Sequence, residues 1–211
     1  MKKIISLVLV LCLVAAFAFA SFKVGFQFGY GGLALNSTKD NNNKLNIGNG
    51  GWYAAAVGEY CISEGLTAKA ELGANGLGLD SYRGTVGGTS ISHKVVSEPS
   101  SLHFNAYAGL QFAFNLFGDI QLAVGGGADV MMGKEGSSTS DSVNIAFGPA
   151  GELALLLSNF GDNFMLFIGG KTAWYLINSD KALGTGYENL GPEPSISYMS
   201  YKFYAGMTYT F

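Results

Sequence analysis

The chain has 211 residues, and its composition is unusual for a soluble protein. Charged residues make up 13% of it, against roughly 25% in ordinary soluble domains, and its 31 glycines are about twice the usual share. A net charge of −3 at pH 7 gives no basis for nucleic-acid binding. After residue 20, no apolar run approaches the ~20 residues that a membrane helix needs.

The first twenty residues have the three parts of a secretory signal peptide. A charged head at Lys2 and Lys3 precedes an apolar run, which ends in the small-x-small cleavage site Ala-Phe-Ala at 18–20. A retained anchor is the alternative, but the short run and the cleavage site favour removal after Ala20. We therefore expect a signal peptide at 1–20 and one exported domain at 21–211. Only Cys61 then remains, so no intramolecular disulfide and no cysteine metal cluster can form.

Eight later segments alternate large apolar residues with small or polar ones, which indicates extended strands. The clearest is the fourth, where every even position from Leu102 to Leu116 is apolar and most odd positions are polar or small. No segment with helical periodicity competes with these strands. The predicted strands cover 22–35, 51–62, 66–79, 101–116, 119–132, 142–157, 163–177 and 197–211.

Two strands contain local departures from the pattern. Pro149 lacks a backbone N–H inside the sixth strand, so a bulge or frayed pairing is expected there. The alternation also slips at Asn75-Gly76-Leu77-Gly78-Leu79, which predicts a glycine bulge.

The connections between the predicted strands alternate between long and short. Long polar connections are expected at 36–50, 80–100, 133–141 and 178–196, and short turns at 63–65, 117–118 and 158–162. This rhythm is typical of an up-and-down outer-membrane barrel, whose long loops are extracellular and whose short turns are periplasmic. An even number of strands lets the last strand close against the first.

Charge placement indicates which face of each strand points outward. A soluble barrel would need charges on its outer face. Here every charged residue within a strand lies opposite the large apolar residues, on a face otherwise made of small and polar residues. These charges are Lys23, Glu59, Lys69, Glu71, Asp129, Glu152, Lys171 and Lys202. The polar face suits the narrow lumen of an eight-stranded barrel, and the apolar face suits lipid.

The predicted fold is therefore all-β: an eight-stranded antiparallel up-and-down transmembrane β-barrel. Aromatic residues near both ends of the strands agree with two interfacial girdles. One girdle comprises Phe22, Tyr60, Phe114, Phe164, Tyr209 and Phe211, and the other Tyr30, Trp52, Phe104 and Trp174.

The ending "FYAGMTYTF" resembles the C-terminal signature of bacterial outer-membrane β-barrels, with Phe203, Met207, Tyr209 and Phe211 at alternating positions. The whole mature chain is similar in pattern to small members such as the OmpX, OmpW and opacity-type proteins. The resemblance implies a place in the bacterial outer membrane, among lipid and lipopolysaccharide or its equivalent. It also implies that the barrel-assembly machinery reads the ending.

The residues offer little for catalysis or cofactor binding. His93 and His103 have serines nearby, but this spacing is weak evidence for a Ser–His site, and a metal site would lack a clear third ligand. Glycine-rich stretches such as "GGGAD" precede no helix, so phosphate binding is not expected. We expect no catalytic residue, no metal and no cofactor.

Two interpretations of the lumen remain open from the sequence. Four acids and four bases can form a polar plug, or they can line a small pore. The leading hypothesis is a non-enzymatic barrel that presents surface loops for adhesion, protection or envelope stability, with a host or surface ligand bound by the loops. The alternative is a narrow pore or transport barrel for small or hydrophobic molecules, and a remote third is a lipid A-modifying enzyme that uses His103.

Overall fold

A computed structural model describes residues 22–40, 43–94, 101–134, 143–158, 163–178 and 195–211. The predicted signal peptide lies outside these residues. The strands are β1 (Phe22–Asp40), β2 (Asn43–Ser63), β3 (Leu66–Val86), β4 (Thr89–Lys94), β5 (Ser101–Phe117), β6 (Ile120–Lys134), β7 (Val143–Leu157), β8 (Phe164–Tyr175), β9 (Ile177–Asn178) and β10 (Ser195–Thr210).

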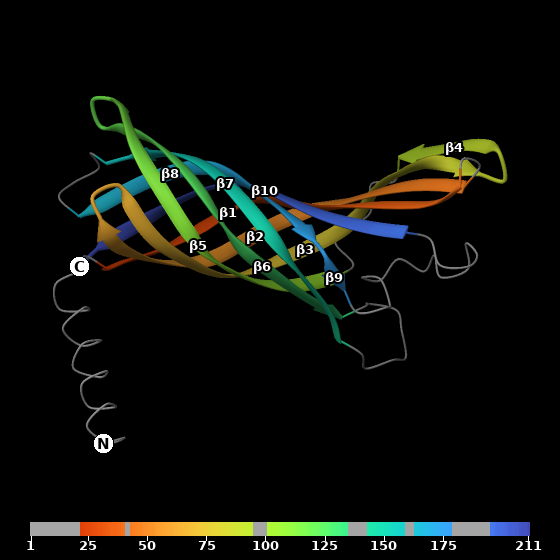
Figure 1. The fold of residues 1–211 in the computed structure, drawn as a ribbon, viewed down its shortest axis with the longest axis horizontal. Coiled ribbons are helices and arrows are strands. Elements are labelled where there is room, and N and C mark those ends of the chain that lie inside the picture. The colour runs from red at the N-terminus through yellow and green to blue at the C-terminus, as the bar shows by residue number, and fades with distance from the viewer. Residues whose placement is uncertain (1–21, 41–42, 95–100, 135–142, 159–162, 179–194) are drawn as a thin grey trace, which may run out of the picture.

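Eight of these strands close into one barrel (Figure 1). Each pairs antiparallel with its neighbours in the order β1, β2, β3, β5, β6, β7, β8 and β10, and β10 returns to β1. The closing ladder extends from Lys23↔Thr210 to Thr38↔Ser195. The predicted eight-stranded antiparallel up-and-down barrel is confirmed.

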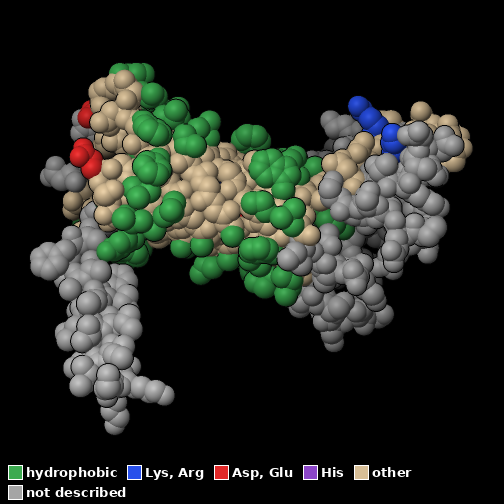
Figure 2. Space-filling view, in the orientation of Figure 1, with side chains coloured by type: hydrophobic (Ala, Val, Ile, Leu, Met, Phe, Trp, Pro, Cys, Tyr) green, Lys and Arg blue, Asp and Glu red, His purple; other side chains and the backbone are tan. Residues whose placement is uncertain are grey.

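The apolar face of the strands is on the outside of the barrel. Successive residues on β5 show the contrast, since Leu110 is 50% exposed and Gln111 is 4% exposed. Figure 2 shows patches of hydrophobic side chains on the outer wall between the two ends of the barrel, where they would contact lipid. Among the residues described, none belongs to a helix long and apolar enough to cross a membrane.

Two of the predicted long connections are mostly strand. At 36–50, β1 and β2 continue their pairing to Asp40↔Asn43, and at 80–100, β3 continues and forms a second hairpin with β4. Gly87 and Gly88 turn this hairpin with φ values of 58° and 80°, which only glycine adopts readily. The loop prediction was wrong because these extensions have no long apolar alternation to identify them. The centres of the other two predicted connections lie outside the described residues.

The pairing of β7 is interrupted next to Pro149, on one side only. Its ladder with β6 continues through Ala128↔Pro149 without a shift. On the other side, the partners change from Ala150↔Ala173 to Phe147↔Ile177, so that two residues of β7 face three of the partner. The missing N–H is therefore accommodated on the β8 and β9 side.

The bulge predicted at residues 75–79 lies elsewhere. The ladder of β3 is regular through this stretch, and the shift against β2 falls between Leu79 and Ser81, opposite Gly48 and Asn49. The break in hydrophobic pattern has a different cause. Leu77 keeps the strand's alternation and points into the lumen, where it is 3% exposed.

Candidate functional site

The lumen holds the charged residues of the barrel wall. All eight predicted lumen charges lie on the inward face, because each occupies one of the alternate strand positions whose side chains point into the barrel. Seven of them are no more than 4% exposed, and Lys23 is partly exposed. The structure brings them together as one group of four and two separate pairs.

The group of four, the lumen quartet, consists of Lys69, Glu71, Glu152 and Lys171. Lys69 Nζ lies 3.1 Å from Glu71 Oε1 and also contacts Glu152 Oε1. Lys171 Nζ contacts the other oxygen of Glu71. Two cations and two anions from β3, β7 and β8 therefore form a neutral chain of ion pairs across the lumen.

A second ion pair is formed by Lys202 and Asp129. Lys202 Nζ lies 3.0 Å from Asp129 Oδ2, and Tyr175 donates its hydroxyl hydrogen to Asp129 Oδ1 at 2.8 Å. Both oxygens of this buried carboxylate therefore have a partner. The third pair is looser, with Lys23 Nζ 3.9 Å from Glu59 Oε2.

Inward tyrosines and a glutamine complete the polar network. The Tyr53 hydroxyl donates to Glu71 Oε2 at 3.1 Å and accepts from Gln27 Nε2 at 2.7 Å, while Tyr204 donates to Glu152. Lys171 Nζ lies 3.6 Å from the centre of the Tyr107 ring, a cation–π contact. The sequence analysis did not single out these tyrosines. Their inward phase beside the charges would have identified them as partners.

Buried apolar side chains also line the lumen, toward both of its ends. Leu77 and Met131 lie nearer the long hairpins than the charges on their strands, whereas Leu156 and Phe167 lie nearer the short turns. The sequence analysis did not identify these inward apolar residues. Each lies an even number of positions from a lumen charge on its own strand, and this spacing would have placed it on the inner face. The first cluster contains Leu33, Leu77, Tyr107, Met131, Ala146, Ala150, Ala173, Tyr175 and Tyr198. The second contains Tyr53, Ala55, Val57, Ala123, Ala154, Leu156, Met165, Phe167 and Tyr204.

A small polar group lies on the hairpin side of the quartet. Asn75 Nδ2 donates to Asn105 Oδ1 at 3.2 Å, and His103 neighbours Asn75 across the β3–β5 ladder. Each is buried and keeps one atom without a hydrogen-bond partner: Asn75 Oδ1, Asn105 Nδ2 and His103 Nδ1. These atoms can bind water or a small polar molecule.

His103, the residue considered for catalysis, lies on β5 with its side chain buried in the lumen. Its ring lies over Gly133, where a Cβ would clash with it. The described part of the chain holds no group of three or more His, Cys, Asp and Glu side chains placed to bind a metal ion. The side chain of His93 lies outside the described structure.

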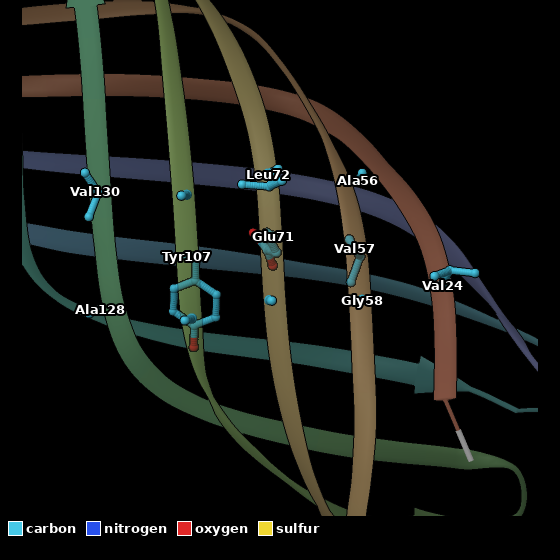
Figure 3. A pocket seen from close by; sticks show the side chains of 12 residues that line it. Val24, Ala56, Val57, Gly58, Glu71, Leu72, Tyr107, Ala128 and Val130 are labelled. Carbon is cyan, nitrogen blue, oxygen red and sulfur yellow. The ribbon is translucent and has the colours of Figure 1, made fainter. Parts of the chain in front are cut away.

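An apolar depression of about 540 Å³ lies in the barrel wall across β1, β2, β3, β5 and β6 (Figure 3). Most of its lining residues belong to the outward face, including Val24, Ala70 and Ala108. The depression faces the lipid side, although Glu71 and Tyr107 of the lumen network also line it. It does not form an opening at the hairpin end.

No protein-family model matches the chain, and no curated protein matches it. Solved structures do. The Neisserial surface protein A (NspA) structure superposes with a TM-score of 0.53 at 13% identity, over 91% of this chain and 99% of that one. The outer-membrane protein AlkL, determined in DMPC lipid bilayers, gives a TM-score of 0.51 at 18% identity, over 91% and 90%. These likenesses establish the fold: the chain has the fold of the small eight-stranded outer-membrane β-barrels, which is the architecture that the strand pattern predicted.

Proposed function

We propose that this chain is an integral outer-membrane protein with a closed lumen, whose barrel holds the hairpins of one end at the cell surface and has no catalytic role. The observation that carries this proposal is the buried lumen quartet between two apolar clusters. An ion crossing the barrel would have to separate these charges and also pass the apolar side chains. Both steps are costly, because charges in a low-dielectric interior need their partners.

The exported and inserted state has support from several features. The outward apolar wall needs a lipid environment. The sequence of residues 1–20 favours export with cleavage near Ala20, and the terminal residues Phe203 to Phe211 fit recognition by the assembly machinery. Both remain proposals, as do contacts with lipopolysaccharide and a surface role in adhesion, protection or envelope stability.

Planar-bilayer recording of the purified, refolded protein tests the closed lumen. We expect little or no steady conductance from the wild type. A Lys171→Met/Glu71→Leu variant removes both ion pairs of Glu71, with Lys69 and with Lys171, and fills the space with apolar side chains, so it should also stay closed. A reproducible ion-selective current through the wild type, altered by neutralising Glu152 or Lys171, would contradict the proposal and favour a pore.

A narrow water-filled passage is the second candidate. It is favoured by the unpartnered atoms of Asn75, His103 and Asn105, which need water or another partner inside the barrel. This candidate predicts that water crosses the lumen even where ions do not. Stopped-flow swelling of proteoliposomes, compared with protein-free liposomes, separates it from a sealed plug.

A further inference from the structure

A row of small outward residues crosses the lipid-facing wall and forms the floor of the depression of about 540 Å³ (Figure 3). We call this depression the wall groove. Leu72 and Val130, each two residues further along its strand than a residue of the row, raise one edge of the groove. Because glycine and alanine have little or no side chain, the wall is lowest along the row. In ladder order from β1 to β6, the row consists of Val24, Gly58, Ala70, Ala108 and Ala128.

The direction of the wall groove follows from the stagger of the strands. Directly opposed residues, followed once around the barrel from Phe22, lead back to β1 at Gly32, ten residues further along the strand. With ~3.4 Å per residue and ~4.8 Å between strands, this stagger tilts the strands by about 40° from the barrel axis. The groove runs across the strands, so it is inclined by about 50° to the membrane normal. Lipid acyl chains lie on average along this normal and therefore match the groove poorly.

A second copy of the chain matches this direction. Two copies in one membrane have the same orientation, so a twofold axis along the membrane normal can relate them. Their strands tilt with the same hand when each barrel is viewed from outside, and they therefore lean in opposite directions where the two walls face each other. The facing strands then cross at about 80°, so a strand of one copy lies within about 10° of the groove of the other.

Strand β3 has the surface that such a contact needs. Leu72 is 70% exposed and stands beside the groove, so it projects from an otherwise low part of the wall. A twofold contact uses the same surface on both copies, which must therefore carry both a projection and the hollow that receives it. Leu72 and the wall groove provide this combination. The other outward residues of this part of β3 are Ala68, Ala70, Ala74 and Gly76.

We propose that the wall groove is the contact between two copies of this chain in the membrane, with Leu72 of each copy in the groove of the other. Within lipid, small residues favour association because they allow two backbones to approach closely. Strands β2, β3, β5 and β6 span about 19 Å, and over an apolar band of ~25 Å they offer at most about 480 Å² per copy.

The available area also determines how stable the dimer is. The total of about 950 Å² lies below the ~1,200 Å² at which stable interfaces begin. The dimer is therefore reversible, and its population depends on the protein concentration in the membrane. The inference rests on the proposed function only in requiring that the barrel be inserted in a bilayer.

Energy transfer between fluorophores in lipid vesicles tests this contact. Residues 21–211 contain one cysteine, Cys61, which is partly exposed near a short turn and can carry either the donor or the acceptor. We expect transfer above the level of randomly placed labels, rising as the lipid-to-protein ratio is lowered. Ala108→Phe fills the groove and should lower the association constant about tenfold, because its ring occupies the space that receives Leu72. Leu72→Ala removes the projecting side chain and should lower the constant a few-fold.

The matched control is Ala205→Phe, which places the same ring on the outer face of β10, on the far side of the barrel from the groove. It should associate as the wild type does, and the heat-modifiable gel shift of each variant shows whether its barrel has folded. Transfer at the random level in the wild type would overturn the inference and leave lipid as the occupant of the groove.

Equal losses in Ala108→Phe and Ala205→Phe would also overturn it. If Ala108→Phe does not fold, unchanged transfer in Leu72→Ala has the same consequence, since this variant only removes atoms from the surface. None of these outcomes bears on the conductance of a single barrel, so the closed-lumen proposal succeeds or fails separately.

Discussion

Lys69 on β3 and Glu152 on β7 form an ion pair across the lumen, although 83 positions separate them in the sequence. Lys69 also contacts Glu71 on its own strand at 3.1 Å. The same lysine thereby joins opposite walls of the barrel. The quartet therefore links strands β3, β7 and β8 across the lumen.

We predict that Glu152→Gln destabilises the barrel by about 3 kcal/mol, because removing one partner leaves an excess buried cation. The free energy of unfolding in lipid bilayers, followed by urea titration, measures the loss. The double variant Lys69→Met/Glu152→Leu removes both charges and should lose much less. If the double variant is the less stable of the two, the ion pair contributes more than its desolvation costs, and this prediction is wrong.

We predict that Leu110→Lys damages folding into lipid far more than Gln111→Lys. Leu110 is 50% exposed on the outer wall, where a lysine at mid-depth costs about 2–4 kcal/mol. Gln111 is 4% exposed and points into the polar lumen, so a lysine there would not enter hydrocarbon. Unfolding titrations of both variants in bilayers provide the comparison. Equal losses would mean that the depth of Leu110 in the membrane is misjudged.

Two glycines on the outer face provide a matched pair. The Trp52 indole lies over Gly76, so a side chain at this position would clash with the ring, whereas nothing lies within 4 Å of a Cβ added at Gly151. We predict that Gly76→Val costs about 1–3 kcal/mol through displacement of Trp52. Gly151→Val should be neutral or stabilising, because valine suits a strand. Tryptophan fluorescence should shift in the first variant and stay unchanged in the second.

Deletion of Phe211 is predicted to lower the yield of assembled barrel in the outer membrane. Phe211 is 76% exposed, its ring packs against Tyr209 with centroids 5.1 Å apart, and its N–H donates to Phe22 O at 3.1 Å. The heat-modifiable gel shift of membrane fractions is the readout. Leu116→Ala is the control, since it removes an outward apolar side chain at the same end without touching the terminus. Normal assembly of the truncated chain alone would argue against an assembly role for the ending.

The sequence alone determined the direction of the two faces. Successive side chains of a strand point to opposite sides, so once Leu110 is known to face outward, Gln111 must face inward. The same rule was sufficient to assign every lumen charge from Lys23 to Lys202 to the inner face. The eight-stranded closure followed from counting these strands and from the alternation of long and short connections.

Only the tertiary structure decided which charges meet. Whether Lys69 contacts Glu152, or Lys202 contacts Asp129, depends on the stagger of the strands around the closed barrel. The alternation of residues along one strand gives no information about this stagger. The sheet formed by residues 36–40, 43–48 and 81–94 was also beyond sequence reasoning. Its strands extend past the membrane, where no apolar face is required, and they are held by backbone hydrogen bonds that any polar residue can make. Periodicity therefore revealed the part of the fold that lipid constrains, and long-range pairing decided the remainder.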